Sequence, residues 1–168
     1  MAPFMTIGLL TLHVLSIAAI AITVFYGIHI PDGGGAFGRH FLYALAAACL
    51  AVFTHTMTYF YFVGMGANLK RAVEEHGRGK DRLAESRKIK AKVLPWAFLG
   101  MGILMVTFIL GGGAHTRAIP SWIHGGLGYL ALGYSVVALL VEGYYLLQQN
   151  GLVNAFQREL LGAREPAD

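Results

Sequence analysis

Hydrophobic residues gather in four long runs, and most polar residues lie between them. The runs cover residues 4–30, 41–67, 93–113 and 122–147. Each reaches the roughly 20 apolar residues with which an α-helix crosses the hydrocarbon core of a bilayer. The chain shows no period-two alternation that would indicate β-strands. The pattern therefore predicts an all-α protein with four transmembrane helices.

The connections predict how these helices are arranged. Residues 31–39 and 114–121 are short, glycine- and proline-rich turns, so the spans that they join are antiparallel. The longer segment 68–92 is expected to continue both neighbouring helices, with a break at the sequence HGRGK (76–80). The polar tail after Gln148 is expected to fray. We predict a four-helix up-and-down bundle without an internal repeat.

Composition agrees with one integral membrane domain over residues 1–168. The chain is 56% hydrophobic and only 13% charged, whereas soluble domains are about 25% charged. The first span has no basic segment before it and is too long for a typical signal peptide. The single cysteine, Cys49, cannot form an internal disulfide and is interpreted as a small apolar residue.

Basic residues are concentrated in one connection. Residues 70–92 hold nine Lys or Arg and four Asp or Glu, a net charge of +5. Basic loops stay on the cytoplasmic side of a membrane, so both termini are also expected there. The other two turns then face outward, which in the inner membrane of a bacterium is the periplasm. This charge is explained by membrane topology, and no nucleic-acid partner is expected.

Histidines supply the candidate chemistry, because ionisable residues inside membrane spans are costly and usually functional. In antiparallel helices, residues equally distant from the turn lie at the same depth. This rule places His13 level with His55 in one layer, and it places four other histidines together in a second layer at the outer edge of the membrane. The two layers lie roughly 22–24 Å apart at 1.5 Å rise per residue. The outer residues are His29, His40, His115 and His124.

Helical phase selects among the outer histidines. His40 and His55 differ by about 60° around their helix, so both can face the bundle core. His13 and His29 differ by about 160°, so His29 is the weakest candidate. We therefore expect His40 to pair with His124, with His115 as the reserve ligand. Gly125 and Gly128, which follow His124, would let a flat macrocycle approach the backbone, and Ala48 and Ala51 would do the same near His55.

Paired imidazoles on facing helices are the axial ligands of b-type haem, and two layers favour one or two haems. The predicted iron ligands are His13 with His55 and His40 with His124. Arg39 and Arg117, the outer-loop cations, would pair with haem propionates or a quinone headgroup, or simply reach the interface. Glu142 is interpreted as a solvated helix-end carboxylate, with a proton carrier as the alternative.

The four spans with His13, His40, His55 and His124 resemble small membrane b-type cytochromes. Similar proteins are the cytochrome b561-like proteins and the haem-bearing anchors of succinate or formate dehydrogenase type. The resemblance implies a subunit that carries electrons across or within the bilayer and exchanges them with quinone or a redox partner. The His40–His55 spacing is slightly longer than the usual one in such proteins.

Two other functions remain open on the sequence alone. The chain can be a structural or anchor subunit of a larger respiratory or photosynthetic complex, with a pigment on one imidazole or no cofactor. It can also hold zinc or copper at the outer histidines. No P-loop, nucleophile elbow or HExxH motif is present, so any catalysis would be redox chemistry as part of an oxidoreductase. Membrane lipid and further subunits are the expected partners.

Overall fold

A computed structural model describes residues 2–29 and 35–162 of the chain and confirms the predicted all-α architecture. These residues form four helices, each long and apolar enough to cross a membrane. They are α1 (Ala2–Ile28), α2 (Gly35–His76), α3 (Lys80–His115) and α4 (Ser121–Gly162).

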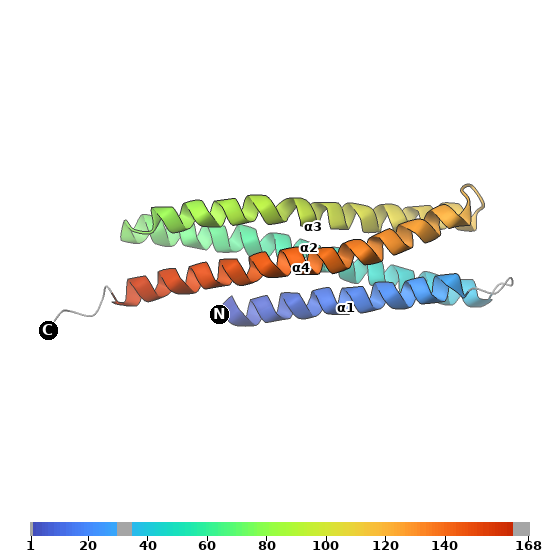
Figure 1. The fold of residues 1–168 in the computed structure, drawn as a ribbon, viewed down its shortest axis with the longest axis horizontal. Helices are drawn as coiled ribbons and strands as arrows, with labels where there is room; N and C mark the ends of the chain where they lie inside the picture. Colours follow the sequence, from blue (N-terminus) through green and yellow to red (C-terminus); the bar gives the residue numbers. More distant parts are fainter. Residues whose placement is uncertain (1, 30–34, 163–168) are drawn as a thin grey trace.

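The helices run antiparallel in one elongated bundle (Figure 1). Each helix packs on its neighbours in the chain, and α1 also packs on α4, which closes the bundle. In this arrangement α2 and α4 face each other across the bundle and make far fewer contacts. α1 ends and α2 begins at the same end of the bundle as the turn between α3 and α4, and we call this the turn end; α1 begins and α4 ends toward the other end (Figure 1).

The helices are longer than a bilayer is thick. The 42 residues of α2 extend about 63 Å at 1.5 Å per residue, whereas a hydrocarbon core is about 30 Å thick. The charged segment 68–92 accordingly continues α2 and α3 as helix, as predicted. The break falls at Gly77 and Gly79, which both have positive φ (66° and 82°), a conformation that glycine adopts without strain.

The predicted fraying after Gln148 is wrong. Helix α4 continues to Gly162 because the polar-looking sequence still has an apolar face. Leu152, Val153 and Phe156 are buried in one apolar cluster with residues of α2 and α3. The end of α4 extends past the start of α1 (Figure 1). At the exposed rim, Arg82 donates a hydrogen bond to Glu159 at 2.6 Å.

Large apolar side chains cover much of the outer surface of the bundle, as expected for helices that contact lipid. The buried cluster in the turn-end half of the interior instead contains three alanines, Ala47, Ala51 and Ala131, beside Ile20 and Leu104. Small residues let membrane helices approach closely. Cys49 lies on the exposed surface.

The structure also shows an internal repeat, which the sequence analysis did not predict. Buried positions recur 84 residues apart in the two helical hairpins, although their residue types mostly differ. A two-fold arrangement of hairpins explains this, because equivalent faces of α1 and α3, and of α2 and α4, then point inward. The buried pairs are Leu9 with Val93, Ile20 with Leu104, Ala47 with Ala131, Ala51 with Ser135, Phe62 with Leu146 and Leu69 with Val153.

The α2–α3 turn gives a stability prediction. A Cβ atom on Gly79 would overlap the Phe156 ring, whereas one on Gly77 would meet nothing within 4 Å. Gly77→Ala should cost about 1–2 kcal/mol through left-handed strain alone. Gly79→Ala should cost distinctly more, because Phe156 must also move. Thermal unfolding in detergent measures the difference, and equal midpoints would contradict the packing described here.

Candidate functional site

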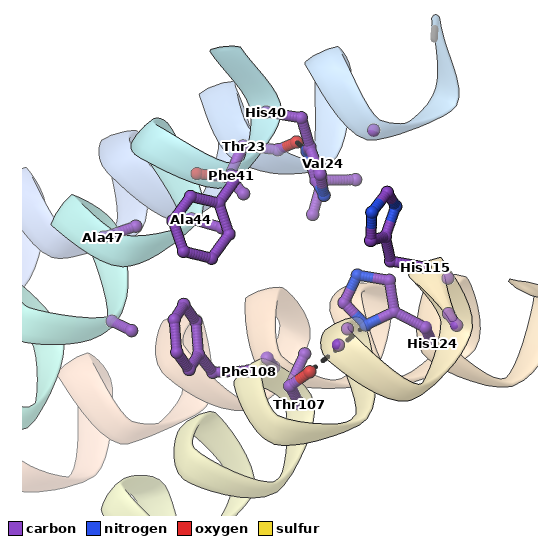
Figure 2. A pocket seen from close by; sticks show the side chains of 18 of the residues that line it. Thr23, Val24, His40, Phe41, Ala44, Ala47, Thr107, Phe108, His115 and His124 are labelled. Carbon is purple, nitrogen blue, oxygen red and sulfur yellow. Dashed lines mark hydrogen bonds between the residues drawn. The ribbon is translucent and has the colours of Figure 1, made fainter. Parts of the chain in front are cut away.

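A pocket of about 690 Å³ opens near the turn end of the bundle and is lined by all four helices. Its volume falls within the roughly 300–1,000 Å³ of typical ligand and cofactor sites. The pocket lies between α2 and α4, the two helices that face each other across the bundle, and His40 and His124 project into it from these helices (Figure 2).

His40 is held by a hydrogen bond to the neighbouring helix. Its Nδ1 lies 3.2 Å from the backbone carbonyl oxygen of Thr23 on α1. A carbonyl oxygen only accepts, so Nδ1 carries the proton and donates. The neutral ring then has its lone pair on Nε2, which is the nitrogen left for a ligand.

His124 repeats this arrangement in the second hairpin. Its Nδ1 donates to the carbonyl oxygen of Thr107 on α3 at 3.1 Å (Figure 2). The residues are equivalent by the internal repeat, since 23 and 107, like 40 and 124, are 84 positions apart. Histidines that bind metals almost always donate their other ring N–H to a carbonyl or carboxylate, which fixes the tautomer and the ring orientation.

The two imidazoles face each other at a distance suited to one shared metal ion. Their ring centroids are 6.1 Å apart and their planes differ by 76°. With metal–nitrogen bonds of about 2.0–2.1 Å, imidazoles on opposite sides of one ion have centroids about 6.3 Å apart. The His40–His124 separation therefore needs little change to hold an ion between the rings.

Two glycines make room for these rings. A Cβ atom on Gly27 would lie 2.9 Å from His40 Cε1, and one on Gly111 would lie 3.0 Å from His124 Cε1. Gly27 and Gly111 are also 84 positions apart. Each hairpin thus carries one unit, Thr-x3-Gly-x12-His, in which the glycine seats the ring and the threonine carbonyl orients it.

The remaining lining is apolar. Phe37, Phe41 and Phe108 line the pocket together with small residues, and Ile109 and Tyr129 extend it to the lipid-facing surface, where they are 65% and 55% exposed. The small residues of the lining include Ala44, Ala47, Ala48, Gly125 and Gly128. An apolar lining with a few convergent polar groups is typical of cofactor sites.

The other predicted outer residues lie at the margin or outside. His115 lines the pocket mouth, where its ring stacks on Phe37 at 3.7 Å. His29 is exposed, donates from Nδ1 to the Phe25 carbonyl oxygen, and stays outside the lining, as its helical phase predicts. Arg39 and Arg117 are exposed and do not contribute to the described pocket lining.

A second group of polar side chains lies deeper in the bundle. His13 on α1 and His55 on α2 come together as predicted, with ring centroids 5.4 Å apart. Glu142 on α4 lies against both rings. His55 Nδ1 donates to Glu142 Oε1 at 2.9 Å, and His13 Nε2 lies 3.3 Å from Glu142 Oε2. We call these three residues the inner cluster.

The interpretation of Glu142 as a solvated carboxylate is wrong. Its side chain is fully buried, and His13 and His55 are 3% and 2% exposed. The sequence placed Glu142 near the end of an apolar run, but α4 continues for 20 residues beyond it, so this position lies well inside the bundle. The hint in the sequence was an acidic residue in an otherwise apolar span.

Sequence reasoning also missed the residues that hold the outer rings. Thr23, Thr107, Gly27 and Gly111 are unremarkable as single residues in apolar helices. The repeated Thr-x3-Gly-x12-His spacing was the available signal. This signal was weak because the spacing is defined by only three of the eighteen positions in each unit.

Comparison with known proteins adds no assignment. No protein-family model, no curated protein and no solved structure matches this chain. Function is therefore inferred from the two groups of side chains described above.

The inner cluster depends on a close approach of α3. A Cβ atom on Gly100 would lie 2.6 Å from His55 Nε2, whereas one on Gly102 would meet nothing within 4 Å. Gly100→Ala should destabilise the protein by about 1–3 kcal/mol through overpacking. Gly102→Ala should be neutral or stabilising, because alanine is the better helix former. Thermal unfolding midpoints of the two variants test this, and a harmless Gly100→Ala would contradict the described contact.

Proposed function

We propose that this chain is a membrane b-type haem protein that binds one haem between His40 and His124 and transfers electrons. The observation that supports this most strongly is the opposed pair of imidazoles, each oriented through Nδ1 by a carbonyl of a neighbouring helix. Low-spin haem in cytochromes takes two axial ligands from the protein.

The pocket suits this group in size and in chemistry. Its volume is about 690 Å³, small residues beside the histidines leave room, and three phenylalanines offer apolar contacts to a macrocycle. The pocket opens near the turn end, where polar haem substituents would reach water. Arg39 and Arg117 are exposed at that end, so they are available to propionates only if their side chains turn toward the pocket.

The protein residues have defined roles in this proposal. Haem supplies reversible one-electron chemistry at its iron. Thr23 and Thr107 hold the two rings in the tautomer that presents Nε2. Gly27 and Gly111 seat the rings against α1 and α3, and the surrounding apolar side chains exclude water and so influence the reduction potential.

The proposal is limited to one haem. The rings of His13 and His55 are closer than those of the outer pair and both contact Glu142. A haem there would require the rings to separate and the carboxylate to move away. The outer pocket needs no comparable change.

The membrane setting suggests the partners. We propose that segment 70–92 faces the bacterial cytoplasm and that the pocket faces the periplasmic side of the inner membrane. The lateral opening beside Ile109 and Tyr129 would admit a quinone or the surface of a redox subunit. A respiratory or photosynthetic complex subunit that binds one pigment molecule is a weaker candidate, because two imidazoles oppose each other here.

Optical spectroscopy tests the proposed haem. Protein purified from cells that make haem should show Soret and α bands in a reduced-minus-oxidised spectrum. His40→Ala and His124→Ala should each abolish the low-spin spectrum, because each removes an axial ligand. His29→Ala is the matched control at the same end, because His29 lies outside the pocket lining, and it should retain the spectrum.

Two outcomes would overturn the haem assignment. One is a folded, colourless wild-type protein, and the other is an unchanged low-spin spectrum in both His40→Ala and His124→Ala. Zinc or copper bound to haem-free protein at the outer histidines would instead favour a metal site without porphyrin.

The glycine seats give an independent test. Gly111→Ala should weaken haem retention and shift the bands, because the added methyl group displaces the His124 ring. Gly102→Ala on the same helix is the matched control, since Gly102 lies outside the pocket lining and its Cβ atom would meet nothing within 4 Å. Haem content per chain measures both, and equal retention would contradict the seating role.

A further inference from the structure

The inner cluster has the composition of a metal site. His13, His55 and Glu142 each present one ligand atom, and these atoms all lie within 4.8 Å of one another. Two imidazoles and one carboxylate form the ligand set of several catalytic zinc sites and of non-haem iron(II) sites. The three side chains come from three different helices, so the fold itself assembles the set.

The distances are close to those of a metal-bound set. In a tetrahedral site with bonds of about 2.0–2.1 Å, neighbouring ligand atoms are about 3.3 Å apart. His55 Nδ1 is 2.9 Å from Glu142 Oε1, and His13 Nε2 is 3.3 Å from Glu142 Oε2. The third separation, between the His13 and His55 ligand atoms, is at most 4.8 Å and would have to close toward about 3.3 Å to place all three ligand atoms around one ion.

The polar groups of the cluster are incompletely satisfied without an ion. Glu142 Oε2 is buried and accepts no hydrogen bond within the described part of the chain, despite its proximity to His13. A buried carboxylate oxygen left in this way is costly. A divalent cation would satisfy it and compensate its charge. Thr58 Oγ1 lies 3.3 Å from His13 Nε2, next to the three proposed ligands.

The inner cluster differs from the outer pocket in that its residues do not follow the internal repeat. The outer pocket uses equivalent residues from both hairpins. In the inner cluster the repeat is broken, because His13 corresponds to Ala97, His55 to Leu139 and Glu142 to Thr58. Gly100, which makes room for His55, corresponds to Ser16. All four differences build one asymmetric site, so packing in a symmetric bundle does not account for them.

We infer that His13 Nε2, His55 Nδ1 and the Glu142 carboxylate bind one divalent first-row metal ion of the zinc or iron(II) class inside the bundle. This inference does not depend on haem in the outer pocket. The ion would link α1, α2 and α4 at mid-bundle and stabilise their packing, because a ligand that binds only the folded state stabilises it.

Metal analysis of purified protein tests the inference. The protein carries a tag other than polyhistidine, is loaded separately with Zn²⁺ or anaerobically with Fe²⁺, and is desalted before elemental analysis. A His40→Ala/His124→Ala background removes haem iron from the count. We expect about one ion per chain. The metal that binds and survives desalting distinguishes zinc from iron.

Variants at the cluster give the specific control. Glu142→Gln preserves shape but removes the charge, and should lower retained metal by about tenfold or more, since even outer-shell changes cost about 10–100-fold in affinity. Its haem spectrum should persist. Metal retained by a folded, colourless wild-type protein would contradict the proposed function alone, and a haem-containing wild-type protein that retains no metal would contradict this inference alone.

A measurement on the unaltered chain covers the case in which Glu142→Gln does not fold. Loading wild-type protein with Zn²⁺ or Fe²⁺ should raise its thermal midpoint, and a chelator should reverse the rise. Metal retained equally by a folded Glu142→Gln variant would overturn the inference. So would wild-type protein that neither retains either ion nor gains stability from it.

Discussion

The structure depends on one constraint, which is that polar groups in an apolar bundle need partners inside it. The inward-facing imidazoles of His40, His55 and His124 are each oriented by an oxygen atom from another helix. His40 and His124 use backbone carbonyls of α1 and α3, and His55 uses the carboxylate of α4. These bonds cross between helices, so they fix helix positions at the same time as they fix the rings.

The two sites differ in whether the two helical hairpins contribute equivalent residues to them. The two hairpins contribute identical Thr-x3-Gly-x12-His units to the outer pocket, and a ligand with two opposite axial positions matches such a pair. The inner cluster combines residues that the hairpins do not share, and its carboxylate comes only from α4. One bundle can thus present a symmetric site near its turn end and an asymmetric one deeper inside. In our proposals these bind haem and a divalent ion, respectively.

The sequence by itself determined the helical architecture. Four apolar runs of membrane-spanning length, two short turns and a basic connection broken at glycine are local properties, and local properties suffice for helices and their order. Counting residues from the turns also placed His13 with His55 and His40 with His124, because helical rise and phase are regular. Helical phase correctly set His29 apart.

Only the tertiary structure decided what surrounds those histidines. Glu142 is far in sequence from both His13 and His55, and its burial depends on how far α4 extends past it. The carbonyls of Thr23 and Thr107 leave no mark on side-chain patterns, since any residue could supply them. Gly27, Gly111 and Gly100 make room for histidine rings only because two helices come into contact at these positions. Contacts between helices depend on rotation and separation, and these are set by the packing of the whole bundle.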